Sequence, residues 1–255
     1  MALRLTNALL NGSRRVLTRT GGLLFVVLLA HEALLITSLN TVVTAADPAA
    51  MGDVIGLTLP VSGTVAGVLL AGTLVSNAVY FVVLSRAFAR PKSQLSSFPA
   101  DLVTRRIGRA SLTMLVSGCI VLLAVMIGFA FLFLPGLFLS ACFFFVIFTI
   151  GIEDRGVIGS LKRSWGLSQG NRLRLVALVV IIGISSTVVS FAPTLLRMVD
   201  APILGDVATI FLNSVLFIFV YGIMAEAYLQ VSERDTGPGG TSTAATAGTR
   251  STPEI

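Results

Sequence analysis

The sequence is poor in the residues that most enzymes and metal sites need. It has a single histidine, two cysteines and one tryptophan, and only 12% of its 255 residues are charged. One histidine excludes most histidine-based catalysis and most zinc sites. The cysteines, Cys119 and Cys142, lie in apolar stretches without CxxC spacing, and neither a GxxxxGK[ST] nor an HExxH motif occurs. We therefore expect neither enzymatic activity nor a bound metal or cofactor.

Long apolar runs without charge take up most of the chain. Hydrophobic residues make up 55% of it and the mean hydropathy is +0.94, whereas soluble domains are about 45–50% apolar and about 25% charged. A hydrocarbon core about 30 Å thick needs about 20 apolar residues in a helix, because lipid cannot hydrogen-bond an open backbone. The composition predicts an all-α integral membrane bundle.

Six segments are predicted to span the membrane. The first, second, fifth and sixth cover about residues 21–43, 60–84, 175–192 and 207–230. Residues 110–152 carry no charge, and one helix of that length would be about twice as long as the bilayer core is thick. Pro135-Gly136 predicts the turn between a third span ending near Phe131 and a fourth starting at Leu137. The fourth is short enough that incomplete crossing is an open alternative.

The N-terminal stretch mixes leucine with arginine and predicts an amphipathic helix on the membrane surface. An alternative is a cleaved signal peptide, because basic residues precede an apolar run and Thr44-Ala45-Ala46 resembles a cleavage site. Cleavage would leave five spans. The run is long for a signal peptide and is interrupted by His31 and Glu32, which favours a retained first span.

The basic residues predict the orientation. The formal net charge is +6, and every lysine and arginine except Arg197 falls on one side of the predicted spans. Because basic residues concentrate in the cytoplasm, both termini are predicted to be cytoplasmic in a multi-pass protein of the cell membrane. Anionic lipid headgroups are the expected partners, and nucleic acid is not. Residues 1–231 are predicted as the membrane domain, and residues 232–255 as a disordered cytoplasmic tail.

Residues 156–170 predict a second surface helix. Ile158, Leu161 and Trp165 recur at helical spacing, with Lys162 at the border of that stripe and Arg163 off it. In one interpretation the apolar side enters the lipid, Trp165 anchors at headgroup level and the two cations bind phosphates. In the other, the helix packs under the bundle.

Residues 105–192 resemble the multi-pass membrane domain that occurs alone or fused to glycerophosphoryl diester phosphodiesterases. The resemblance rests on four short motifs, Leu134-Pro135-Gly136, Glu153-Asp154, Ser160-Leu161-Lys162-Arg163-Ser164-Trp165 and Gly170-Asn171. It implies a six-helix bundle and no established activity for stand-alone members. It implies no phosphodiesterase site, because that chemistry belongs to a separate soluble domain.

Three ionisable residues lie inside predicted spans, where such groups are functional candidates. His31 and Glu32 stand near the middle of the first span, and Glu226 stands near the inner end of the sixth. They could form a proton or solute path. Alternatively, they could fix the packing through hydrogen bonds across helices to groups such as Ser76, Asn77, Asn213 or Tyr221. The sequence thus favours a structural or accessory membrane component with a basic face that binds lipids or partner proteins. The alternative is a small transporter that uses His31, Glu32 and Glu226.

Overall fold

A computed structural model describes residues 5–47, 56–91 and 101–235, and within these ranges the chain is helical and contains no strand. Six segments are long and apolar enough to cross a membrane. The predicted all-α membrane bundle is confirmed. The helices are α1 (Leu5–Val16), α2 (Arg19–Ala46), α3 (Gly63–Phe88), α4 (Asp101–Thr104), α5 (Ile107–Phe131), α6 (Phe133–Cys142), α7 (Val146–Gly151), α8 (Val157–Ser168), α9 (Arg172–Met198) and α10 (Pro202–Asp235).

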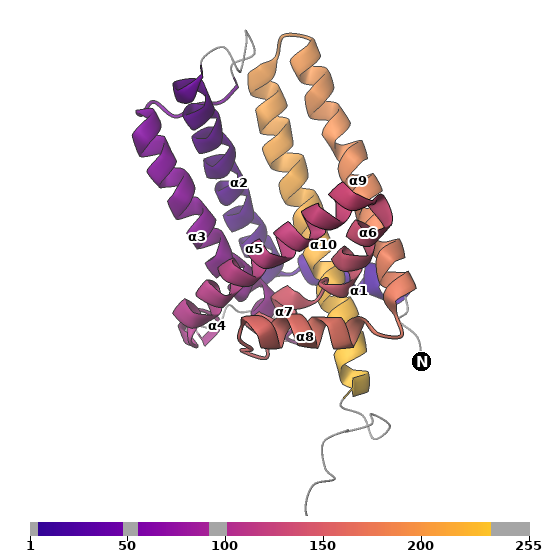
Figure 1. Cartoon of the computed structure of the whole chain (residues 1–255). Coiled ribbons are helices and arrows are strands. Elements are labelled where there is room, and N and C mark those ends of the chain that lie inside the picture. The colour runs from indigo at the N-terminus through magenta and orange to yellow at the C-terminus, as the bar shows by residue number, and fades with distance from the viewer. Residues whose placement is uncertain (1–4, 48–55, 92–100, 236–255) are drawn as a thin grey trace, which may run out of the picture.

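Two helix pairs, α2 with α3 and α9 with α10, stand upright and diverge toward one end of the molecule (Figure 1). The short helices α4, α7 and α8 gather with α1 at the other end, and α5 runs obliquely across the bundle (Figure 1). We call the end that holds α1, α4, α7 and α8 the basic end, because the described basic residues of these helices and of the loops around them lie there. The end that holds the α2–α3 and α9–α10 connections is the opposite end.

The last two spans are longer than the sequence predicts. The fifth was expected to stop before Pro193, but α9 continues through this proline to Met198. Membrane helices tolerate proline because neighbouring groups can satisfy the freed carbonyl. Helix α10 extends the sixth span at both ends, to Pro202 and to Asp235. Most of the predicted tail, residues 236–255, lies outside the described residues.

The turn between the third and fourth spans is at Leu132, so its predicted position at Pro135-Gly136 is wrong. Leu132 is extended and separates α5 from α6, and Pro135 lies in the first turn of α6. Proline fits there because the first N–H groups of a helix have no partner within it. The fourth segment then breaks at residues 143–145, between α6 of 10 residues and α7 of 6 residues. Neither piece alone matches the thickness of a bilayer.

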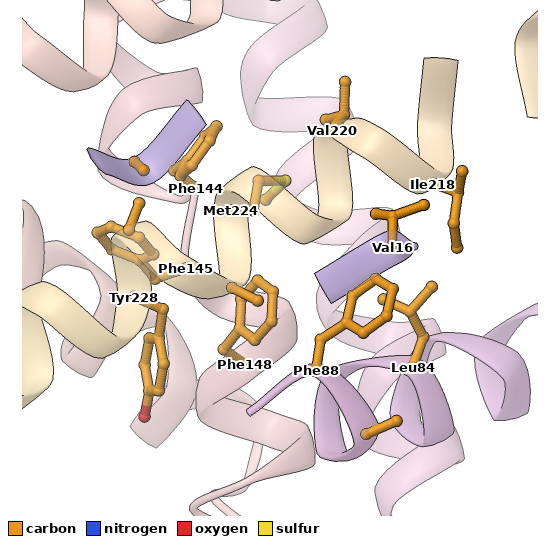
Figure 2. Packing of buried hydrophobic residues seen from close by; sticks show 14 of the residues in the cluster. Val16, Leu84, Phe88, Phe144, Phe145, Phe148, Ile218, Val220, Met224 and Tyr228 are labelled. Atoms are coloured by element: carbon orange, nitrogen blue, oxygen red, sulfur yellow. The ribbon is translucent and has the colours of Figure 1, made fainter. Parts of the chain in front are cut away.

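The densest packing lies at the basic end. Phe88 of α3, Phe148 of α7 and Phe145, which precedes α7, are fully buried. Figure 2 shows Phe148 between Phe88 and Tyr228 of α10, and the Phe148 and Tyr228 rings stack 5.4 Å apart. Elsewhere the long helices carry many exposed large apolar side chains, as expected of surfaces that face lipid.

Helix α1 packs its small residues against α10. A Cβ on Gly12 would lie 2.6 Å from Cα of Ile223, and one on Gly222 would lie 2.7 Å from the Gly12 carbonyl oxygen. The two backbones are therefore in close contact. Leu10 and Leu17 point away from the bundle, 57% and 77% exposed. This arrangement suits an in-plane helix whose leucines enter the lipid.

Candidate functional site

Arg15 joins three elements at the basic end. Its side chain is buried, and its Nε donates to Oε2 of Glu226 at 2.9 Å. Its Nη1 donates to the carbonyl oxygens of Phe88 and Arg90 at 2.9 and 2.7 Å. These carbonyls belong to the last turn of α3 and the residues after it, where a helix leaves acceptors without partners. Arg15 thus neutralises a carboxylate of α10 and caps the end of α3.

Arg86 has the same connecting role between α3, α4 and α7. It is buried near the end of α3, and its Nη2 donates to Oδ1 of Asp154 at 3.1 Å. Its Nε donates to the Gly151 carbonyl at 2.9 Å and its Nη1 to the Leu102 carbonyl at 3.2 Å. Arg105 binds the other oxygen of Asp154 at 2.6 Å. Arg86 therefore ties α3 to α4 and to the end of α7.

Glu153 accepts three side-chain hydrogen bonds. The Tyr228 hydroxyl and Nε of Arg163 donate to its Oε1 at 2.8 and 3.2 Å, and Arg155 donates to Oε2. Burial raises the pKa of the Glu153 carboxyl, but the hydrogen bonds from Arg155, Tyr228 and Arg163 outweigh it and the net pKa lies below the ordinary value. Glu153 is therefore ionised at neutral pH and joins α8 to α10.

The structure separates the three ionisable residues predicted inside the spans. Glu226 bonds to Arg15 and Asn11 of α1. The Nε2 of His31 lies 2.9 Å from the Ser76 hydroxyl of α3, one of the packing partners that the sequence suggested. Glu32 is half-buried and lies close enough to the hydroxyls of Tyr80 and Tyr221 to interact electrostatically with both. His31 and Glu32 thus face α3 and α10, whereas Glu226 belongs to the α1 contact.

Helix α8 buries a face of serines, and the apolar stripe identified in the sequence is less buried. Its buried side chains are three serines at four-residue spacing and Leu167, while Ile158 is 68% exposed. Small hydroxyls fill this contact because they allow close approach and bond to backbone. The Ser164 hydroxyl donates to the Cys142 carbonyl at 2.9 Å and accepts from the Phe145 N–H at 3.2 Å, across the break in the fourth segment. The serines are Ser160, Ser164 and Ser168.

The three residues proposed for lipid contact on α8 have different surroundings. Lys162 is exposed. Arg163 is bonded to Glu153, so it is not free to follow a lipid phosphate. Trp165 is half-buried, with its ring 5.8 Å from Phe138 and 6.0 Å from Phe143 and with the Arg172 guanidinium 4.8 Å away. It packs α8 against the fourth segment, and Lys162 is the most exposed of the three residues.

Residues 166–170 spell the Gly-x-Ser-x-Gly pattern of hydrolase nucleophiles. Ser168 is fully buried at the end of α8 and donates to the Trp165 carbonyl at 2.8 Å. A nucleophile elbow requires an exposed serine on a turn between a strand and a helix. The described part of the chain has no strand, and its histidine is bonded to Ser76. The pattern therefore does not form that site here.

A fourth polar cluster at the opposite end was not predicted. Asp206 is buried, and its Oδ1 accepts from Nη2 of Arg197 at 2.7 Å. Its Oδ2 accepts from Nδ2 of Asn40 at 2.9 Å and from the Leu57 N–H at 2.7 Å. The cluster joins the α9–α10 turn to α2 and to the segment before α3. The position of Arg197, the one basic residue on that side, was the only sequence signal for it.

Four further cations at the basic end point outward beside apolar side chains. Lys162 and Arg174 are both exposed, near Ile158 and Leu173 of the same helices, which are 68% and 86% exposed. Arg14 and Arg19 flank Leu17. This alternation of cations and exposed apolar groups is typical of a membrane–water boundary.

Comparison with known families identifies one match. A family described only as a domain of unknown function, DUF7847, matches residues 3–231. No curated protein and no solved structure matches the chain. These comparisons provide no link to the membrane domain of glycerophosphoryl diester phosphodiesterases. A match over most of the length shows that the chain belongs to the DUF7847 family, a domain of unknown function.

Proposed function

We propose that this protein is a noncatalytic component of the cell membrane whose basic end binds anionic lipid headgroups. The observation that carries the proposal is the division of charge at that end. Glu153, Asp154 and Glu226 are bonded to arginines within the fold. Exposed cations, by contrast, stand beside exposed apolar groups. The outward surface is therefore cationic where the membrane surface is expected to lie.

The orientation is part of this proposal. The cytoplasmic leaflet carries anionic lipids that attract basic residues near the membrane surface, and basic residues concentrate on that side during insertion. We place the basic end, and with it both termini, in the cytoplasm. The resemblance of residues 105–192 to the phosphodiesterase-associated membrane domain extends, in this proposal, to architecture alone.

The test measures lipid preference in reconstituted protein. Arg14, Arg19 and Arg174 are changed together to Gln, and the matched control changes the same three to Lys, which retains the charge. The enrichment of phosphatidylglycerol over phosphatidylcholine around the protein is measured in nanodiscs that contain both lipids. We expect the Gln variant to lose phosphatidylglycerol preference, by up to about 1 kcal/mol per cation. An equal preference in wild type, Gln and Lys variants would refute lipid binding at this end.

A small transporter is the second candidate. It is favoured by the half-buried Glu32 among Tyr80 and Tyr221, near the middle of the first span. The bonding of Glu226 to Arg15 counts against a path shared by all three residues. Proton or cation flux into proteoliposomes that falls with Glu32→Gln, but not with Lys162→Gln, would support transport. Absence of flux in the wild type would remove this candidate.

A further inference from the structure

A small pocket at the start of α5 is lined by three arginines. Arg106 precedes α5 as its N-cap residue, Arg109 lies in the first turn of α5, and Arg155 lies in the connection between α7 and α8. Asp154 is the acidic residue in the lining. All three arginines are exposed, so a ligand can reach them from outside the bundle.

Among the described side chains, the carboxylates near this pocket do not balance its positive charge. Asp154 is bonded through one oxygen to Arg86 and through the other to Arg105, and neither of these arginines lines the pocket. Arg155 is bonded to Glu153, which also accepts from Arg163. The carboxylates near the pocket are therefore shared among more arginines than they can neutralise. The surplus positive charge favours an anion with several acceptor oxygens.

An apolar surface begins directly beside the pocket. Along α5, five large apolar side chains one to five turns beyond Arg109 are exposed, from 40% to 64%. They recur at three- or four-residue spacing and so form one stripe along the helix. The stripe consists of Leu112, Val116, Ile120, Leu123 and Ile127. A molecule with an anionic end and long hydrocarbon chains could contact the pocket and the stripe together.

We infer that this pocket is a stoichiometric binding site for one anionic phospholipid. The phosphate binds at the mouth of the pocket, against the exposed guanidinium groups of Arg106, Arg109 and Arg155, and the acyl chains follow the stripe of α5. Helix α5 has no side-chain cap at its N-terminus, which adds a smaller attraction for negative charge. The inference rests on the proposed function, because it places the pocket at the membrane surface. It goes further in naming a single saturable site rather than a diffuse preference.

The test compares two double variants in the full-length protein. Arg106→Asn/Arg109→Gln removes two pocket charges, and Asn is chosen at 106 because that residue has φ 42°, a backbone conformation that Asn tolerates. The control, Arg14→Gln/Lys162→Gln, removes two exposed cations outside the pocket, which contribute to the diffuse lipid preference but not to the single site. Delipidated protein in detergent is titrated with phosphatidylglycerol, phosphatidylcholine or inorganic phosphate, and bound lipid is counted by native mass spectrometry.

We expect one tightly bound phosphatidylglycerol per wild-type chain and per control chain. The pocket variant should bind it about 25-fold more weakly, because each cation near an anionic group contributes a factor of about five. The single Arg109→Gln variant, at an exposed helical position, should show about a fivefold loss and guards against misfolding of the double variant. Phosphatidylcholine and inorganic phosphate should not compete at the same concentrations.

Other results would overturn the inference. Equal losses in the pocket and control variants, without a one-to-one complex, would leave a diffuse preference and so retain the proposed function without this site. Competition by inorganic phosphate at matched concentration would assign the pocket to a soluble anion.

A different result would separate the two proposals. No preference for phosphatidylglycerol in the nanodisc experiment, with one-to-one binding retained in detergent, would reject the proposed function but not the pocket.

Discussion

Arg15 is buried at the junction of three helices, where water cannot replace the partners it would lose. Its bonds to Glu226 and to the end of α3 connect segments far apart in the sequence. Arg86 does the same for α3, α4 and α7. At the scale of single residues, arginines of this protein therefore have two roles, as buried connectors and as exposed surface cations.

The buried pair predicts a large effect of one substitution. Arg15→Met retains length and apolar contact but leaves Glu226 without its cation. Removing one partner of a buried ion pair typically costs about 3–5 kcal/mol, so the midpoint of thermal unfolding in detergent should fall clearly. Arg19→Met, at an exposed position four residues on, serves as the control and should have little effect. Equal midpoints for the two variants would show that the pair contributes nothing to stability.

Glu153 predicts a pH dependence with a definite sign. Its pKa is lower in the folded protein than the ordinary value. Its contribution to stability is therefore complete above the ordinary carboxyl pKa of about 4.3 and is lost as the pH falls through the lowered folded-state pKa. Thermal unfolding of wild type and Glu153→Gln is compared between neutral and acidic pH. The difference in midpoint should be constant above about pH 5 and should shrink in more acidic solution. A difference that grows on acidification would contradict this assignment.

At the scale of elements, the fourth segment and α8 form one unit. The segment breaks at residues 143–145, and Ser164 of α8 bonds to backbone groups on both sides of the break. Inside a membrane protein, irregular backbone persists only where its polar groups are satisfied. Helix α8 therefore does more than lie at the surface, because its buried serine face completes the backbone of a membrane segment.

This role distinguishes two serines of the same helix face. Ser164→Ala removes the bonds to Cys142 and Phe145, and an unsatisfied buried polar group costs about 1–3 kcal/mol. Ser160→Ala removes a bond only within α8, although Ser160 is equally buried. We expect Ser164→Ala to lower the unfolding midpoint in detergent and to speed hydrogen exchange near residue 145, and Ser160→Ala to do neither. A similar loss in both variants would indicate packing alone.

At the scale of the whole molecule, charge is distributed unequally between the two ends. The basic end holds α1, α4, α7 and α8 (Figure 1) and carries the exposed cations. At the opposite end, Arg197 is bonded to the buried Asp206. This asymmetry underlies the proposed orientation, because a positive end is retained in the cytoplasm.

Cysteine labelling tests that orientation. In a background with Cys119→Ser and Cys142→Ala, a cysteine replaces either Val61 at the opposite end or Lys162 at the basic end. Intact cells treated with a membrane-impermeant maleimide should label Val61→Cys, and Lys162→Cys should react only after permeabilisation. Labelling of Lys162→Cys in intact cells would show that the protein has the opposite orientation in the membrane.

The sequence alone predicted the class of this protein and the six segments that are long and apolar enough to span a membrane. Uncharged apolar runs must form helices in lipid, since no solvent there can hydrogen-bond to the backbone. The clustering of arginine outside those runs can likewise be read directly from residue positions in the sequence. The sequence also identified His31 as a candidate packing residue. Ser76, whose hydroxyl lies within hydrogen-bond distance of His31, is one of the partners that the sequence suggested. These inferences need only local pattern and the properties of the bilayer.

The tertiary structure alone decided which charges are used inside the fold. Glu226 meets Arg15, Asp206 meets Asn40 and Glu153 meets Tyr228 across long separations in sequence, and no local periodicity encodes such pairs. The same is true of α8, where the apolar stripe of the sequence is less buried than the serines, because packing against the broken fourth segment requires small groups that can bond to backbone. The sequence shows where helices form, but which face of each is buried depends on the neighbours that the fold supplies.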